Sequence, residues 1–294
     1  MLLLGRRDVD SVCMIAVGEF SELKVKALLP EGVVLGEGPN DVLLPSRWAP
    51  AGVLPGQTLR VFVYTDSEDE LIATVQTPHA TVGQFAFLEV VDVNEHGAFL
   101  DWGLEKDLFV PRSLQHQPLQ VGRSYVVAVF LDERTRRVAA SSSLGGFFDY
   151  DLTQLELGQR VNLLVYGFSE RGAQVVVDGR YSGLVYASET FTRLDLGDRL
   201  EGFVKTIRPD NKLDIALHRV GREAADDAVL LVLEALRAGG GTLKLTDRSP
   251  PEEIYAVLGI SKKAFKMAVG KLYKARRIAL CDSDIRLLGD TAKD

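Results

Sequence analysis

The chain has 294 residues and a hydrophobic fraction of 46%, which is ordinary for globular protein and sufficient for several buried cores. Its net charge of −7 excludes a protein that coats nucleic acid by bulk positive charge, although local basic patches remain able to bind phosphate. The apolar run at residues 2–4 is too short for a signal peptide, no run of 18 apolar residues predicts a membrane span, and Cys13 and Cys281 predict reduced thiols, so we expect a soluble cytoplasmic protein without membrane partners.

The first segment, residues 1–78, predicts a small β domain. Strands are expected at 12–18, 23–29, 33–35, 42–44, 59–65 and 70–75, and the proline-rich loop from Pro45 to Pro55 is expected to be irregular. An acidic cluster follows at residues 66–70. It would repel phosphate, so this domain suits RNA least, and a solvated loop is favoured over a metal site.

The next segment, residues 82–141, has apolar residues that alternate or run in short blocks separated by Gly, Asn or Asp. This pattern predicts about five short antiparallel strands in a closed or nearly closed barrel. Asn94 to Gly97 is expected to form the first hairpin turn, with Gly97 at positive φ.

The chain also contains domain-sized repeats. Four positions recur with one offset of 75 residues: Gly83, Gly97, Ser113 and Gly122 return as Gly158, Gly172, Ser188 and Gly197. A fainter copy lies upstream at an offset of 66, where Asp41, Pro45, Gly56 and Asp66 precede Asp107, Pro111, Gly122 and Asp132. We therefore predict three tandem barrels, a degenerate one at 1–78 and two more at 79–146 and 147–220. Residues 142–150, small and then aromatic, are expected to pack between the second and third barrels.

A different period begins at Arg222 and predicts a small α+β domain over residues 221–294. Apolar residues at three- and four-residue spacing predict a helix at 222–238, which ends at three glycines. A second helix is expected from a Ser249 cap to Gly259, and a third from a Ser261 cap to Ala275. With a strand at 242–245 and a hairpin at 278–288, this order predicts a winged helix-turn-helix domain.

The second repeat resembles an S1-type RNA-binding domain, a five-stranded oligonucleotide-binding (OB-fold) barrel. The resemblance rests on Gly97-Ala98-Phe99-Leu100-Asp101, Gly103, Phe109-Val110-Pro111-Arg112-Ser113, Gly122 and Asp132…Arg137-Val138-Ala139-Ala140-Ser141. Pro111 departs from the family, which often has His there. In the third repeat, 182–188 is similar to the same S1 strand. Three S1-type barrels followed by a winged helix resemble the conserved virulence factor B family of bacteria. The expected fold is mainly β, with the small α+β domain at the end.

This resemblance implies which residues hold RNA. On the second barrel they are His96, Phe99, Asp132 and Arg137, and on the third barrel Arg171, Tyr186 and Lys212. Aromatic rings stack on bases, and cations contact phosphate. Strand alternation puts Phe99 opposite Ala98, Leu100 and Trp102, so we expect those three in the core and Phe99 outside. The alternatives are a plain turn residue for His96 and a solvated hairpin for the arginines; Phe168 is a further candidate, although a core position is favoured.

The third helix of the winged-helix domain supplies a second candidate surface. From Ser261 to Arg277 every charged side chain is positive, and the candidates are Lys262, Lys263, Lys266, Lys271, Lys274 and Arg277. The apolar set of this helix, expected on the other face, is Phe265, Ala268, Val269, Leu272 and Tyr273. No Arg, Asn or Gln lies in the helix body, so lysine–phosphate contact is favoured over sequence-specific DNA readout. A solvated basic face, or an acidic protein partner, remains an alternative.

No pattern predicts catalysis. The four histidines are scattered without metal-ligand spacing, no glycine-rich phosphate loop is present, and no nucleophile–base set can be argued. We therefore expect no enzyme, cofactor, metal or small-molecule substrate. The function predicted is non-catalytic capture of single-stranded RNA, with DNA as an alternative ligand, and the resemblance implies post-transcriptional regulation. The competing hypothesis is a protein-interaction scaffold whose barrels have largely lost RNA contact.

Overall fold

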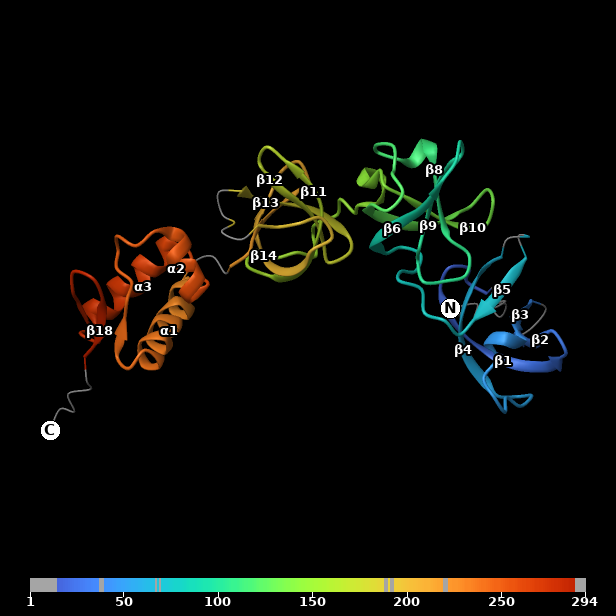
Figure 1. Cartoon of the computed structure of the whole chain (residues 1–294), viewed down its shortest axis with the longest axis horizontal. Helices are drawn as coiled ribbons and strands as arrows, with labels where there is room; N and C mark the ends of the chain where they lie inside the picture. Colours follow the sequence, from blue (N-terminus) through green and yellow to red (C-terminus); the bar gives the residue numbers. More distant parts are fainter. Residues whose placement is uncertain are drawn as a thin grey trace, which may run out of the picture. The chain divides into compact units, whose positions relative to one another are not determined.

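A computed structural model describes residues 15–36, 40–66, 68, 70–187, 190, 193–218 and 222–288, with only the backbone described for 222–227. The chain divides into two compact units, Met1–Phe147 and Phe148–Asp294. The described residues form three closed five-stranded barrels, a three-stranded sheet and helices α1 to α3 (Figure 1). The predicted fold class is therefore confirmed. None of the described helices is both long and apolar enough to span a membrane.

Barrel 1 has the strand order β1-β2-β3-β5-β4. Its strands are β1 (Phe20–Leu29), β2 (Gly32–Gly36), β3 (Asp41–Pro45), β4 (Thr58–Thr65) and β5 (Leu71–Thr74). The strand predicted at 12–18 is wrong where it is described, because residues 15–18 are coil and turn. Gly18 has a φ of +84°, donates its N–H to the Val63 carbonyl at 2.7 Å and accepts from the Val82 N–H at 2.9 Å, so the chain turns here.

Barrel 2 repeats this order around the ring. Its strands are β6 (Phe85–Val93), β7 (Gly97–Leu100), β8 (Leu108–Pro111), β9 (Ser124–Asp132) and β10 (Arg137–Ser141). The β6–β7 turn is built by Asn94, whose side-chain oxygen accepts the N–H groups of His96 at 2.8 Å and Gly97 at 3.1 Å. The expectation of positive φ at Gly97 is wrong, since that backbone does not lie in the left-handed region.

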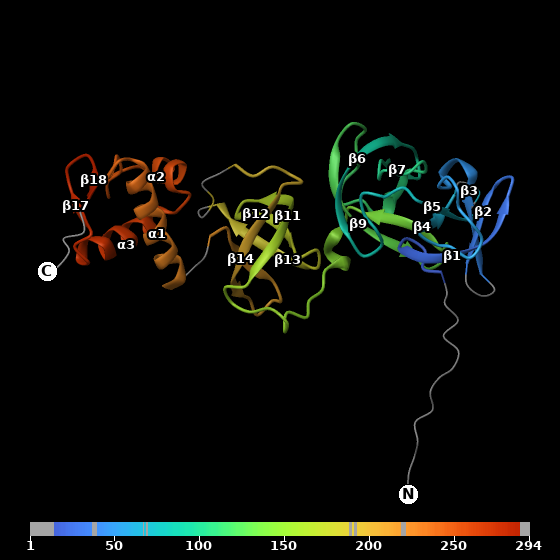
Figure 2. The same ribbon diagram turned by 90° about the horizontal axis from the view of Figure 1, so that it is seen from below.

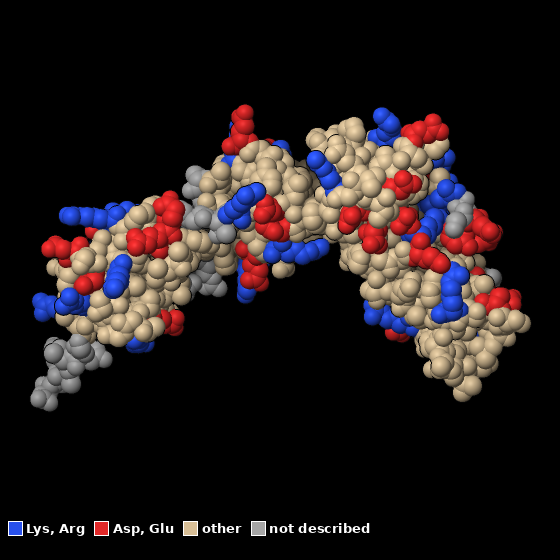
Figure 3. Space-filling view, viewed as in Figure 1, with Lys and Arg blue, Asp and Glu red and all other residues tan. Residues whose placement is uncertain are grey.

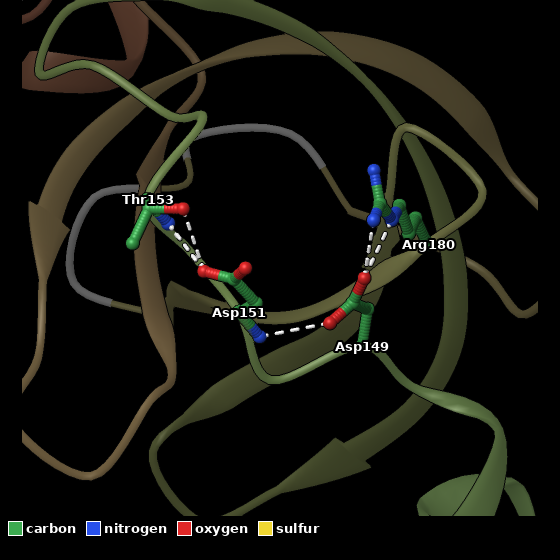
Figure 4. A network of polar contacts seen from close by, with 4 residues as sticks. All are labelled: Asp149, Asp151, Thr153 and Arg180. Carbon is green, nitrogen blue, oxygen red and sulfur yellow. Dashed lines mark hydrogen bonds and ion pairs between the residues drawn. The ribbon is translucent and has the colours of Figure 1, made fainter. Parts of the chain in front are cut away.

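Barrel 3 has the same strand order again. Its strands are β11 (Arg160–Ser169), β12 (Gly172–Val177), β13 (Tyr181–Tyr186), β14 (Arg199–Ile207) and β15 (Leu213–Ala216). The segment that precedes β11, residues 149–153, is fixed by polar contacts, which are shown in Figure 4. Arg180 donates to the Asp149 carboxylate at 2.7 Å, Asp149 accepts the Asp151 N–H at 2.8 Å, and Asp151 accepts from Thr153. These contacts hold the segment that carries Leu152 and Leu155 into the barrel core.

Residues 142–148, between barrels 2 and 3, make contacts with the barrel on either side along the chain. The N–H groups of Ser142 and Ser143 donate to the Leu114 carbonyl, and a short 3-10 helix covers Leu144–Phe147. Phe147 lies 5.3 Å from Phe130 of barrel 2, measured between ring centroids. Phe148 lies 5.6 Å from Tyr166 of barrel 3 by the same measure.

The C-terminal domain is a winged helix. It comprises α1 (Arg222–Ala238), β16 (Thr242–Leu243), α2 (Pro251–Leu258), α3 (Lys262–Lys274), β17 (Ile278–Leu280) and β18 (Ile285–Leu287). The hairpin β17–β18 pairs with β16 and follows α3 (Figure 2). Ser261 caps α3 as predicted, accepting the Ala264 N–H at 3.2 Å. Ser249 does not cap α2: Pro250 is the N-cap residue, and the Ser249 hydroxyl accepts the Thr246 N–H instead.

Candidate nucleic-acid interface

The outer surface of barrel 2 carries an aromatic row across its sheet. Cα partners in successive strands are Phe99 with Phe109, Phe109 with Ala139, and Ala139 with Phe130. Partners in register lie on the same face of a sheet. On every one of these strands at least one neighbour along the chain, such as Ala98, Leu108, Val129 or Ala140, is in the barrel core, so the row faces away from it. We call Phe99, Phe109, Ala139 and Phe130 the outer row of barrel 2.

Phe99 and Phe109 form the centre of this row. Their ring centroids are 5.1 Å apart, and both side chains are half-buried, which leaves part of each ring accessible. Ala98, Leu100 and Trp102 are buried, so the predicted alternation around Phe99 is confirmed. Sequence reasoning missed Phe109, although Leu108 and Val110 on either side are core residues and the same alternation identifies it.

Gly97 makes room for this aromatic pair. A Cβ atom on Gly97 would lie 2.2 Å from the Val110 carbonyl oxygen and 2.7 Å from the Phe109 ring. The glycine is therefore required by close approach of the neighbouring strand. The Phe109 ring lies over the backbone of β7, where any larger residue would displace it.

Polar candidates surround the row. Arg137 is exposed and lies two residues before Ala139 on β10, so it shares the outer face. Asp132 begins the β9–β10 turn, where its carboxylate accepts the N–H of Arg134 at 2.9 Å; hydrogen bonds from Thr135 and Arg134 lower its pKa. His96 is at the opposite turn with its side chain 75% exposed, and its carbonyl accepts the Arg112 N–H.

Part of the equivalent face of barrel 1, the outer side of β4 and β5, is covered by barrel 2. Its core contains Val61, Val63 and Ala73, so Phe62, Tyr64 and Ile72 face outward, and these three belong to the hydrophobic core of barrel 2. The Trp102 ring makes edge contacts with Phe62 and Tyr64, with centroid separations of 5.7 and 6.3 Å. Burial raises the pKa of Tyr64 to about 12.

The acidic loop of barrel 1 is also part of this contact. The Lys106 ammonium donates to the Thr65 carbonyl at 3.0 Å and also to the Asp66 carbonyl. The Asp66 carboxylate accepts the N–H groups of Glu68 and Glu70, so it orders its own loop. Barrel 1 therefore packs against barrel 2 through the outer side of β4 and β5, and this side is not open to a ligand.

Barrel 3 brings only part of its predicted set together. Tyr186 is half-buried on β13, and the Arg171 carbonyl accepts the N–H of the adjacent Ala187 at 3.0 Å. Lys212 precedes β15. In the register of β13 and β15, Ala216 lies at the level of Tyr186, and Lys212 is four residues before Ala216. Lys212 is therefore about 13 Å from Tyr186 along the strand direction.

The cation at Tyr186 is instead Lys205, a residue that sequence reasoning missed. Its ammonium is 5.9 Å from the Tyr186 ring centroid. The favoured core position for Phe168 is wrong, since that side chain is 52% exposed at the end of β11.

Helix α3 separates an apolar face from a basic one. Phe265, Ala268, Val269 and Leu272 are buried in the domain core, as predicted, whereas Tyr273 is 56% exposed, so its expected place on that face is wrong. The exposed residues of the helix are Lys263, Lys266, Met267, Lys271, Tyr273 and Lys274. Lys262 and Arg277 are half-buried at its two ends.

Charge elsewhere is mixed. On the face drawn in Figure 3, basic and acidic side chains are interspersed, with no continuous basic surface. Within the described ranges, no group of three or more His, Cys, Asp or Glu side chains is arranged to hold a metal ion. The features that suit a nucleic acid are therefore local: the outer row of barrel 2, the Tyr186 region of barrel 3 and the basic face of α3.

Comparison with known proteins finds two kinds of domain in this chain. The S1 domain model matches residues 17–76 and 82–141, which are barrels 1 and 2. The model of the CvfB-like winged helix domain matches residues 231–287. Among solved structures, the chain is similar to a multidomain protein with nucleic acid binding domains from Streptococcus pneumoniae, at 24% identity over 92% of this chain and 98% of that one, with a TM-score of 0.43.

Relatives are similar over most of the length. Bacillus subtilis YitL is 26% identical over 84% of this chain and 85% of its own. Conserved virulence factor B of Staphylococcus aureus strain N315 is 26% identical over 79% of this chain and 80% of its own. S1 and winged helix domains are binding modules. The chain thus carries S1 domains and a CvfB-like winged helix domain and is a relative of the conserved virulence factor B proteins.

Proposed function

We propose that this chain binds single-stranded RNA without catalysis, chiefly on the outer row of barrel 2. The observation that carries the proposal is the half-exposed Phe99–Phe109 pair, with Arg137 on the same face of the sheet. Each base stacked on an aromatic ring contributes about 1–3 kcal/mol, and an adjacent arginine attracts phosphate. His96 and Asp132 flank the row at the two turns.

Single-stranded RNA fits these features better than a duplex does. Bases in a duplex are stacked on each other, so their faces are not available to protein rings. The α3 lysines, which include Lys263, Lys266 and Lys274, would add phosphate contacts that read no sequence. Several weak sites on one chain raise the affinity through effective concentration.

The proposal extends to the role of the protein. The relatives come from bacteria, and RNA capture without catalysis suits post-transcriptional regulation in the bacterial cytoplasm. The domain boundaries that we propose, 1–78, 79–146, 147–220 and 221–294, assign this binding to the last three domains. The scaffold alternative draws support from barrel 1, where the outer side of β4 and β5 is occupied by barrel 2.

Fluorescence anisotropy tests the proposal. A labelled oligo-uridine is titrated with wild type and with the Phe99→Ala/Arg137→Ala variant at two salt concentrations. We expect binding that weakens as salt rises, and a loss of at least tenfold in the variant, since one stack and one phosphate contact are removed. A matched control is Phe87→Ala/Arg123→Ala, which removes an exposed ring and an exposed arginine from barrel 2 outside the outer row.

The possible results separate the hypotheses. Unchanged affinity in the Phe99→Ala/Arg137→Ala variant would transfer the site to barrel 3 or to α3. Absence of binding to single-stranded RNA at low salt would reject the proposal and leave the scaffold hypothesis.

A further inference from the structure

Barrel 3 presents a carboxylate where barrel 2 presents part of an apolar row. Asp214 is the Cα partner of Leu184, just as Ala139 is the partner of Phe109 in barrel 2. Leu213 and Ile215, its neighbours along β15, are fully buried in the barrel core. Asp214 therefore faces outward with Leu184, and Tyr186 lies two residues further along the same face.

The Asp214 carboxylate lacks a full set of partners. Its Oδ1 atom is buried and accepts no hydrogen bond from any described residue. The Arg208 guanidinium is close to this atom, with its Nη1 3.8 Å away, which is beyond hydrogen-bond distance. Arg208 directs its other terminal nitrogen to Asp210 at 2.9 Å. Buried polar atoms are nearly always hydrogen-bonded, and a ligand that brings a donor would satisfy this one.

An aromatic ring and a cation complete the arrangement. Tyr186 is half-buried, and Lys205 lies near its ring. Phe203 pairs with Ala216 at the same level of the sheet. A base stacked on Tyr186 would have its edge directed along the outer face toward Asp214, with the Lys205 ammonium near the same ring.

We propose that barrel 3 binds a guanine base of single-stranded RNA, stacked on Tyr186 and hydrogen-bonded to the Asp214 carboxylate. A carboxylate only accepts hydrogen bonds, and guanine is the RNA base with two adjacent donors, N1–H and the N2 amino group, on its Watson–Crick edge. Uracil has one donor between two acceptors. Adenine and cytosine each have an amino donor next to an accepting ring nitrogen, which a carboxylate repels.

This inference rests on the proposed RNA binding and adds a base preference to it. The barrel 2 row has only apolar side chains at its centre and makes no such distinction between bases. The chain would thus combine a site that tolerates any base with a site that selects guanine. A purely structural role for Asp214, as a long-range partner of Arg208, predicts no base preference.

Competition between labelled octanucleotides tests the inference. The probes are alternating uridine–guanosine, uridine–inosine and uridine–adenosine strands, together with oligo-uridine. Inosine keeps N1–H and lacks the N2 amino group, so it removes one donor and leaves the stacking ring. For wild type we expect the guanosine strand to bind about tenfold more tightly than the adenosine strand, with inosine between them.

The Asp214→Asn variant should lose the guanosine preference while its affinity for oligo-uridine is not weakened. Glu201→Gln is the matched control, because it removes an exposed carboxylate of the same barrel that pairs with Arg160. Circular dichroism melting of both variants checks their folding. The inosine comparison uses wild type alone and does not depend on how the variants fold.

Each outcome has one meaning. Equal affinity of wild type for guanosine, inosine and adenosine strands would overturn the inference and leave RNA binding intact. Retention of the guanosine preference in folded Asp214→Asn would also overturn it. Absence of binding to every probe at low salt would overturn the proposed function itself.

Discussion

At the scale of single residues, the candidate site depends on how closely two strands of barrel 2 approach. Gly97 is buried under the Phe109 ring and beside the Val110 carbonyl. Its role is not visible in a sequence pattern, because a glycine next to a turn is normally explained by the turn. Phe99 was predictable from alternation, whereas the Lys205–Tyr186 contact was not, since it joins strands that are adjacent only in the folded barrel.

Substitution Gly97→Ala should destabilise unit 1 by about 1–3 kcal/mol, because the new methyl group forces the Val110 carbonyl and the Phe109 ring to move. Denaturant unfolding measures the loss, and RNA affinity should fall with it. Gly146→Ala is the control, since its Cβ atom would meet nothing within 4 Å. Equal stability of the two variants would contradict the close-approach explanation.

At the scale of secondary-structure elements, the longest periodic segments were predicted best. Helix α1 has the predicted bounds, and α3 ends one residue before Ala275, because periodicity and capping agree there. The strand at 12–18 failed where it is described, because an apolar run gives no sign that Gly18 turns the chain. The Ser249 cap failed because two following prolines let Pro250 take the N-cap position.

Helix α3 also has positive charges at its N-terminal end that do not stabilise the helix. Lys262 and Lys263 occupy the first turn, which has no acidic residue, although the positive end of a helix dipole disfavours cations there. These lysines therefore do not stabilise the helix, and contact with RNA phosphates is the role that we propose for them. The buried face of the helix, in contrast, follows directly from its apolar period.

The double variant Lys266→Ala/Lys274→Ala should bind RNA more weakly at low salt and show a smaller dependence on salt. The slope of log affinity against log salt should fall by up to about 1.4, since each phosphate contact with single strands contributes about 0.7. Titration at four salt concentrations gives the slope. Arg237→Ala/Lys244→Ala removes two charges of the same domain outside α3, and a slope change of the same size there would contradict a specific role for the helix.

At the scale of the whole molecule, three barrels with one topology have different uses. Barrel 1 packs the outer side of β4 and β5 against barrel 2, barrel 2 has partly accessible aromatic rings, and barrel 3 has a half-buried tyrosine and a carboxylate on one outer face. The repeat of Gly and Ser positions predicted the common fold. It did not predict the division of roles, because that depends on which outward residues meet another domain.

Packing of barrel 1 on barrel 2 predicts a loss of stability in alkaline solution. Burial raises the pKa of Tyr64 from 10.0 to about 12, so the neutral phenol is favoured in the folded state. Its stabilising contribution is present below pH 10 and is lost as the pH rises from 10 toward 12. Tyr64→Phe should therefore lose less unfolding free energy than wild type between pH 9 and 11, measured by denaturant unfolding.

An ultraviolet titration checks the same group directly. The difference in absorbance at 295 nm between wild type and Tyr64→Phe isolates one tyrosine, which should ionise near pH 12. Tyr273→Phe, which removes an exposed hydroxyl in the other unit, serves as the control. Ionisation of the isolated group near pH 10 would mean that barrels 1 and 2 do not hold Tyr64 out of water.

The contact at Trp102 has a practical consequence for following the protein in solution. The chain has two tryptophans, Trp48 and Trp102, and both lie in Met1–Phe147. Intrinsic tryptophan emission therefore comes from one unit alone, and burial of Trp102 at 2% exposure shifts that emission to short wavelength. A red shift of this emission on heating marks the temperature at which the contact between barrels 1 and 2 opens. A melting step that changes the circular dichroism but leaves tryptophan emission unchanged belongs to Phe148–Asp294.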